Sequence, residues 1–224
     1  MFNPFNSILM KITLTSLFAF LFLFVFLYPS HGEEDERPNI IVFLVDDYDK
    51  PETSPYGGKV LTPNLDRLVK EGMICHNAHV TSTVCTPSRY TFLTGRYASS
   101  SHSNTFLDEC PKGTQALPAF NVGLESDRMN VGRVLADAGY ATGFVGKYHV
   151  HDTDHSKEGS LFGDLDVPKN AKYSDQLNKR KFKLEKLQRE IIKKNGFTWA
   201  KNIYWGNLKQ PFKGHNPDWT AKAA

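Results

Sequence analysis

A continuous apolar run at residues 40–45, with the sequence IIVFLV, places the strongest constraint on how this 224-residue chain can fold. An unbroken run rich in β-branched residues is typical of a strand buried on both faces, as in parallel sheets. Two adjacent carboxylates, Asp46 and Asp47, follow the run directly. The pattern predicts an α/β fold in which a buried strand delivers two acids to the carboxyl edge of the sheet, where ligands bind.

The two acids are candidate metal ligands. Successive side chains of an extended strand point to opposite faces, so Asp46 and Asp47 can converge only if the strand breaks into a loop after Val45. Carboxylate oxygens are hard donors, which suit Ca²⁺ or Mg²⁺ better than zinc. Solvated acids at the end of a strand are the alternative that these residues alone leave open.

Residues 84–96, VCTPSRYTFLTGR, predict a helix with a reactive first turn. Thr86 can cap a helix, and Pro87 suits its first position. Cys85 would then lie beside free N–H groups and the positive end of the helix dipole, which favour an anion. Arg89 lies one turn further along the same face and can donate paired N–H bonds to that anion. A buried cysteine near a solvated arginine is the alternative.

Residues 140–149, YATGFVGKYH, predict a strand that ends in polar site residues. Lys147 and His149 are two positions apart, so their side chains project to one side of an extended chain. An ammonium group can neutralise an anionic oxygen, and an imidazole can hold or donate a proton at moderate pH. A solvated strand-end lysine with a surface histidine is the alternative.

Together these segments resemble the sulfatase family. The run CTPSR at residues 85–89, with TGR at residues 94–96, resembles the first sulfatase signature, and residues 139–149 resemble the second. Thr83 departs mildly from the small residue usual at that position. The resemblance covers about residues 37–149. It implies an alkaline-phosphatase-like α/β fold with a mixed, largely parallel sheet flanked by helices, incomplete at the C-terminus.

The resemblance also implies a mechanism. In the family a formylglycine-generating enzyme oxidises the motif cysteine, so Cys85 would become formylglycine, whose hydrate is the nucleophile. The implied function is hydrolysis of a sulfate ester in a sulfated small molecule or sulfated glycan. The implied ligands of a Ca²⁺ ion, favoured over Mg²⁺, are Asp46, Asp47 and Cys85. The residues implied to orient the hydrate and the sulfate are Arg89, Lys147 and His149.

Family members carry further metal ligands, another lysine and a leaving-group histidine that cannot be assigned in this sequence. Ca²⁺ takes about six to eight oxygen ligands. We therefore expect weak metal binding and little or no turnover from the chain as written. The expected organisation is a signal peptide at residues 1–32, followed at residues 33–224 by a truncated N-terminal part of a sulfatase catalytic domain.

The beginning of the chain predicts export. Residues 12–28 are almost wholly apolar, follow a lysine and precede small residues at Ser30 and Gly32, a pattern typical of a secretory signal. A retained signal anchor is the alternative. We expect a secreted, secretory-pathway, lysosome-like or periplasmic protein with no stable membrane span after cleavage. Export permits disulfides, and a bridge between Cys75 and Cys110 is left open.

The rest of the sequence predicts structural elements without an assigned role in the site. The near-balanced net charge of +3 gives no reason to expect a nucleic acid partner. A cluster with two histidines and two acids is interpreted as a polar loop rather than a zinc site; it comprises His151, Asp152, Asp154 and His155. The remaining predictions are a helix from Pro63, a strand at residues 73–80, a surface loop at 98–124, a helix capped by Asn130, a lysine-rich helix at 174–195 and a turn-rich tail from Trp199.

Two alternative functions remain at this point. A phosphomonoester or phosphonate hydrolase of the same superfamily is one, because the shape of the pocket decides the ester. A non-catalytic secreted fragment that binds sulfated polyanions is the other, through the lysine-rich face of residues 174–195. Such a face is more commonly solvated, and that is the default interpretation.

Overall fold

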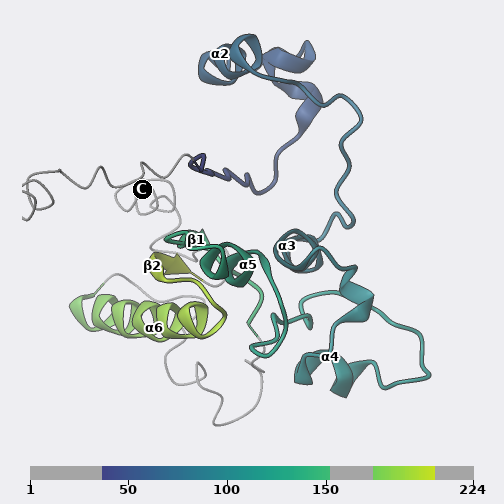
Figure 1. The fold of residues 1–224 in the computed structure, drawn as a ribbon, viewed down its shortest axis with the longest axis vertical. Helices are drawn as coiled ribbons and strands as arrows, with labels where there is room; N and C mark the ends of the chain where they lie inside the picture. The colour runs from purple at the N-terminus through teal and green to yellow at the C-terminus, as the bar shows by residue number, and fades with distance from the viewer. Residues whose placement is uncertain (1–36, 152–173, 205–224) are drawn as a thin grey trace, which may run out of the picture. The chain divides into compact units, whose positions relative to one another are not determined.

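The computed structural model describes residues 37–151 and 174–204 (Figure 1). The signal-peptide prediction at residues 1–32 and the acids and histidine at residues 152–155 lie outside the described residues. So does the tail from residue 205 onward. The chain divides into two compact units, Met1–Val45 and Asp46–Ala224.

In the first unit, the described residues 37–45 form no strand, so the prediction of a buried strand is wrong for this structure. The six apolar residues are exposed, from 43% for Leu44 to 91% for Ile41. A strand needs a neighbouring backbone to accept and donate its hydrogen bonds. Within the described part of this unit no such neighbour is present.

The second unit opens with short helices. It contains η1 (Lys50–Glu52), η2 (Ser54–Tyr56) and α2 (Pro63–Glu71). The α2 helix begins at Pro63 as predicted, but the Thr62 side chain does not cap it. The Thr62 hydroxyl instead hydrogen bonds to Ser54 Oγ at 2.7 Å. The strand predicted at residues 73–80 is wrong: the segment is irregular and, among the described residues, pairs with no strand.

Residues 98–124 are not the surface loop that their composition predicts. After α3 (Cys85–Thr94) they contain η3 (Ala98–Ser100) and α4 (Asn104–Glu109). Small polar side chains such as Ser101 and Ser103 are almost fully buried. They tolerate burial because each has a hydrogen-bond partner, so the polar composition of this segment reflects internal bonding rather than solvation.

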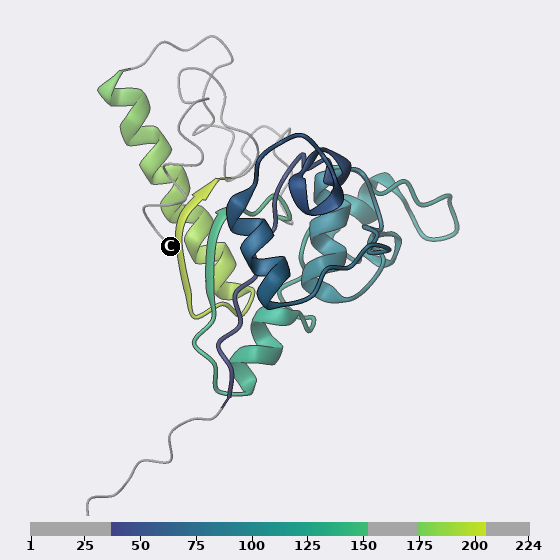
Figure 2. The same ribbon diagram turned by 90° about the horizontal axis from the view of Figure 1, so that it is seen from above.

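The remaining elements are one helix followed by a βαβ unit. They are α5 (Val131–Asp137), β1 (Gly143–Lys147), α6 (Asp175–Lys194) and β2 (Trp199–Tyr204). The two strands pair in parallel, with Gly143 opposite Trp199 and Lys147 opposite Tyr204. The α6 helix packs along β2 in both views (Figures 1 and 2). This parallel sheet with its helices confirms the predicted α/β class, although the tail prediction missed β2.

The helices α5 and α6 confirm the boundary residues that the sequence predicted for them. Asn130 caps α5, because its side chain accepts a hydrogen bond from the backbone N–H of Arg133. The α6 helix ends before Gly196, whose φ of 98° suits glycine and terminates the helix. The buried core draws on α3, η3, α4, α6, β2 and the connecting segments; it comprises Tyr90, Leu93, Ala98, Phe106, Cys110, Val122, Leu124, Tyr148, Val150, Ile192, Phe197, Ala200 and Ile203.

Packing between α5 and the chain after α6 leaves no room at Gly132. A Cβ atom there would lie 2.8 Å from Cε2 of Phe197. We expect Gly132→Ala to lower the free energy of unfolding by about 1–2 kcal/mol, because overpacking costs more than the better helix propensity of alanine returns. Urea denaturation measures this. Adding Phe197→Leu should make the two effects less than additive, and strict additivity would contradict the predicted contact.

No helix in the described part of the chain is long and apolar enough to cross a membrane. All three cysteines fall within the described residues and are free thiols, so Cys75 and Cys110 form no disulfide in this structure.

Candidate active site

The first turn of α3 presents Cys85. The helix begins at Cys85 itself, and Val84 occupies the N-cap position without a side-chain cap. The prediction that Thr86 caps this helix is therefore wrong by two residues. Thr86 is fully buried inside the first turn, where its side chain cannot reach back to the helix start. Cys85 remains partly exposed at the positive end of the helix, as the sequence predicted.

His149 lies against this cysteine. Its Nδ1 atom is 3.2 Å from Cys85 Sγ, and its side chain is almost fully buried, with the ring of Phe120 at a centroid distance of 5.5 Å. The φ angle of His149 is 55°, which is strained for a residue with a Cβ. The chain therefore turns at His149, whereas the sequence interpretation assumed an extended chain there.

Asp46 joins two buried cations. Arg89 Nη2 donates to Asp46 Oδ1 at 3.1 Å, and Lys147 Nζ donates to Asp46 Oδ2 at 2.6 Å. Arg89 Nη1 also donates to the backbone oxygen of Lys147 at 2.8 Å. Burial alone raises the pKa of the Asp46 carboxyl, but the bonds and charges of Lys147 and Arg89 outweigh it and hold that pKa below its ordinary value.

The structure thus brings together five of the six predicted site residues, from three separate segments of the second unit. The contacts form two groups: Cys85 with His149, and Asp46 with Arg89 and Lys147. The backbone links the two groups, because Cys85 and Arg89 lie on α3 and because Lys147 and His149 are two residues apart. Two buried cations with a partly exposed thiol at a helix start form an environment that favours an oxyanion.

Asp47, the sixth predicted residue, stands apart. Its side chain is exposed and makes no hydrogen bond or ion pair within the described residues. Its φ of 52° is a strained left-handed conformation. Asp46 and Asp47 therefore share no partner among the described residues, and the predicted convergence of their side chains is not observed in this structure.

The described residues do not fit a bound Ca²⁺ ion as they are arranged. Both carboxylate oxygens of Asp46 accept hydrogen bonds from cationic side chains, so its charge is already compensated. Nowhere in the described ranges do three or more His, Cys, Asp or Glu side chains form a group able to hold a metal. The donor types are right for calcium, but the observed site is an ion-paired one.

Next to the site, His151 departs from the predicted polar loop. It is 3% exposed, and its ring packs edge-on against Tyr148 at a centroid distance of 4.8 Å. An imidazole with a buried aromatic neighbour belongs to the packing around the site rather than to a solvated loop.

Sequence reasoning missed the buried polar residues behind the site. Tyr90 and Tyr148 are fully buried, and Glu125 and Asn195 pair with their hydroxyls. One signal was available: each tyrosine directly follows a predicted site cation. Glu125 and Asn195 carry no such signal, because only tertiary contacts connect them to the site.

Comparison with known proteins shows the family of this chain. The sequence model of the Sulfatase family matches residues 38–210, so the chain belongs to the sulfatase family. It is 37% identical to human steryl-sulfatase over 155 residues, 66% of this chain and 24% of that protein. It is 36% identical to an N-acetylglucosamine-6-O-sulfatase of Bacteroides thetaiotaomicron over 119 residues, 53% of this chain and 19% of that protein.

A further relative extends across more of the chain. An uncharacterized sulfatase of Escherichia coli K12 is 31% identical over 199 residues, 81% of this chain and 37% of that protein. A solved chain from work on glycosaminoglycan metabolism by Bacteroides thetaiotaomicron is 26% identical with a TM-score of 0.44. It covers 71% of this chain and 27% of that one. The chain thus spans about a fifth to two fifths of the curated relatives that it matches.

Proposed function

We propose that this protein serves the hydrolysis of sulfate esters, with formylglycine derived from Cys85 as the reacting group. The observation that carries the proposal is the contact between Cys85 Sγ and His149 Nδ1 at the start of α3. Membership of the sulfatase family supports the same reaction class. An aldehyde at this position supplies a hydrate that can attack sulfur.

The residues of this chain have separate tasks in the proposal. His149 holds or donates a proton beside the group derived from Cys85, since its Nδ1 faces that side chain. Arg89 and Lys147 bind the anionic sulfate oxygens and stabilise the charge that develops on them. Asp46 keeps both cations close together until substrate competes for them.

Two classes of sulfate ester are proposed as substrates. One relative is named for a steryl sulfate and another for an N-acetylglucosamine sulfate. We propose a sulfated small molecule or a sulfated glycan, and a phosphoester is the competing ester. Rates on 4-methylumbelliferyl sulfate and 4-methylumbelliferyl phosphate compare the two with the same leaving group. Faster hydrolysis of the phosphate would overturn the sulfate proposal.

Modification of Cys85 would require a formylglycine-generating enzyme as partner. The residues around the cysteine are buried: Thr86 and Pro87 are fully buried, and Arg89 is 8% exposed. We therefore expect the modifying enzyme to read this segment only in an unfolded chain, because the folded state hides it unless it opens locally. Mass spectrometry after treating folded and denatured protein in parallel tests this, and equal conversion of the two would contradict it.

Calcium is proposed as a weak ligand only. Both oxygens of Asp46 already bind Lys147 and Arg89, so a cation has to displace these bonds. We expect Ca²⁺ to bind with a Kd of about 1 mM or weaker, the range of the weakest protein sites. Isothermal titration calorimetry measures it. Micromolar affinity that is lost in Asp46→Asn would show that the site rearranges around the metal.

The proposed location is the secretory pathway or the space outside the cell, which rests on the sequence pattern of residues 12–28. Expression of the chain with a C-terminal tag, followed by N-terminal sequencing of the secreted product, tests it. Cleavage near residue 32 is the expected result.

A further inference from the structure

Each of the two site cations is followed in the sequence by a fully buried tyrosine. Tyr90 follows Arg89 on α3, and Tyr148 follows Lys147 at the end of β1. Both tyrosines are 0% exposed, and each hydroxyl bonds to a buried polar group from a distant segment. The same arrangement thus occurs twice, once on each element that contributes to the candidate site.

The first tyrosine is held by a buried carboxylate. Tyr90 Oη donates to both oxygens of Glu125, at 3.0 and 3.2 Å. Glu125 is 5% exposed, and its other partners come from three further segments. They are the backbone N–H of His102 at 2.7 Å, Ser101 Oγ at 3.3 Å, Arg128 Nη1 at 3.4 Å and Arg96 Nη2 at 3.8 Å.

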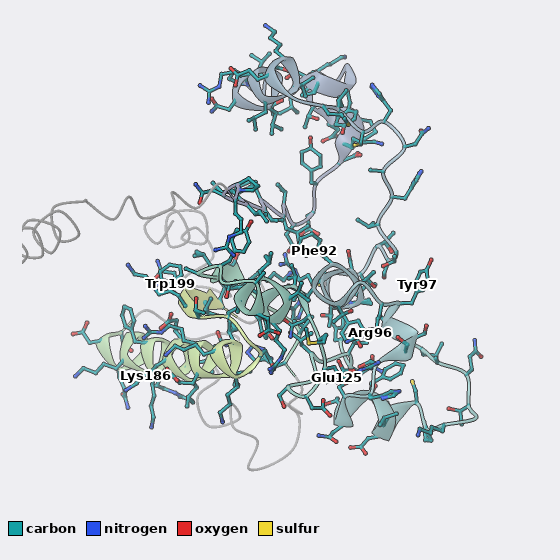
Figure 3. The ribbon with its side chains drawn as sticks, viewed as in Figure 1. Phe92, Arg96, Tyr97, Glu125, Lys186 and Trp199 are labelled. Atoms are coloured by element: carbon teal, nitrogen blue, oxygen red, sulfur yellow. The ribbon has the colours of Figure 1, made fainter. Side chains whose placement is uncertain are left out.

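These hydrogen bonds and ion pairs hold the Glu125 carboxylate in one position. A buried carboxylate with several donors costs little to bury, while loss of a donor leaves it unpaired. Figure 3 shows Glu125 and Arg96 close together on one side of α3. Because Tyr90 lies on α3, its hydrogen bonds to Glu125 restrain the rotation of α3 about its axis.

The second tyrosine is held from the end of α6. Asn195 Nδ2 donates to Tyr148 Oη at 2.7 Å, and Asn195 is 3% exposed. The backbone oxygen of Asn195 accepts from Asn130 Nδ2 at 2.9 Å, which connects the end of α6 to the start of α5. The ring of Tyr148 also packs edge-on against Phe144 at a centroid distance of 5.3 Å.

Neighbouring residues constrain each other's direction. On a helix, adjacent side chains point about 100° apart, so a fixed Tyr90 sets the direction of Arg89. At a strand end, adjacent side chains point to opposite faces, so an inward Tyr148 turns Lys147 toward Asp46. Burial raises the pKa of both tyrosine hydroxyls, so both remain neutral hydrogen-bonding groups.

We propose that Tyr90 with Glu125, and Tyr148 with Asn195, are positioning pairs that hold the two halves of the site in register. The first pair sets α3, which carries Cys85 and Arg89. The second pair sets the end of β1, which carries Lys147 and His149. Neither pair touches the reacting atoms. The consequence for catalysis rests on the proposed function, whereas the positioning itself does not.

The test reads the Cys85–His149 contact directly. The full chain is labelled with ¹⁵N-histidine, and the ring signals of His149 are assigned by their loss in His149→Gln. Cys85→Ala defines the shift that follows when the sulfur is removed. We expect Tyr90→Phe and Tyr148→Phe each to move the His149 signals toward that position, because each variant frees one half of the site.

Ile192→Val is the control for general destabilisation. Ile192 is a fully buried core residue of α6, and its backbone oxygen accepts a hydrogen bond from the N–H of Asn195 at 3.1 Å. Valine keeps this backbone bond and removes one buried methyl group, so the variant loosens the core and should leave the His149 signals in place. Glu125→Gln is a second variant for the α3 pair, since it preserves volume and removes the charge. Unmoved His149 signals in both tyrosine variants, or equal movement in Ile192→Val, would overturn the proposal.

A kinetic readout separates this proposal from the proposed function. In protein carrying the modified Cys85, each tyrosine variant should lower kcat by about 10- to 100-fold, the scale of a misplacement near 1 Å, with a smaller change in KM. If wild-type protein hydrolyses no sulfate ester while the His149 signals move as expected, the proposed function fails and the positioning pairs stand. If the enzyme is active and the signals do not move, the reverse holds.

Discussion

Replacing Cys85 by alanine is expected to abolish both aldehyde labelling of the protein and any hydrolysis of an aryl sulfate. The labelling experiment uses chain coexpressed with a formylglycine-generating enzyme and treated with a fluorescent hydrazide. Alanine has no sulfur to convert, so labelling should fall to background. Any turnover that the modified chain shows should fall to background, because the covalent nucleophile is removed.

Cys75→Ala is the matched control for this result. Cys75 is a free and exposed thiol outside the candidate site, so its removal should leave labelling and hydrolysis unchanged. Because the expected turnover of this chain is small, the labelling is the decisive readout. Aldehyde labelling that persists in Cys85→Ala, or that disappears in Cys75→Ala, would contradict the assignment of the reactive residue.

Replacing Asp46 by asparagine is expected to cause the largest loss of stability among the site variants. Asp46 compensates Lys147, whose side chain is 5% exposed, and Arg89, whose side chain is 9% exposed. Removing the carboxylate charge leaves two buried cations facing each other. We expect the free energy of unfolding to fall by about 1–3 kcal/mol, less than for a fully buried ion pair, because the Asp46 side chain is 29% exposed and water screens part of the loss.

Asp47→Asn controls for this measurement at the neighbouring position. Its side chain is exposed and has no partner within the described residues, so its replacement should change the free energy of unfolding by less than about 0.5 kcal/mol. Equilibrium urea denaturation of both variants gives the comparison. Equal stabilities of the two variants would show that the ion pairs contribute nothing.

The same carboxylate predicts how stability depends on pH. The pairing with Lys147 and Arg89 lowers the pKa of Asp46 from its ordinary value, so the folded state binds this proton less tightly than the unfolded state does. Its contribution is fully present above the unfolded pKa and is lost as the pH falls below about 4 toward the folded pKa. Comparing wild type with Asp46→Asn across this acidic range isolates that contribution. Parallel curves would contradict it.

Local sequence patterns predicted several helix boundaries of the second unit. Pro63 and Asn130 begin helices, and Gly196 ends one, because these residues have backbone preferences that act within a single turn. The position of Cys85 at a helix start was predicted for the same reason. The error by which Thr86 was taken as the cap is small, since local rules leave helix ends uncertain by about one or two residues.

Patterns that need a distant partner were predicted less well. The apolar run at residues 40–45 reads as a strand, yet it is exposed in the described structure because a strand is stable only beside another. Residues 98–124 read as a loop, yet Ser101 and Ser103 are buried because they bond to each other and to a distant glycine. Composition alone cannot distinguish a polar group that is solvated from one that is paired.

The sequence by itself determined the chemistry that this protein can offer: a thiol at the start of a helix, two cations and an imidazole, in the order of the sulfatase signatures. The tertiary structure decided how these groups meet. It paired Cys85 with His149 and placed Asp46 between Arg89 and Lys147. Residue types and local propensities are properties of short segments, whereas contacts between distant segments depend on packing that no single segment contains.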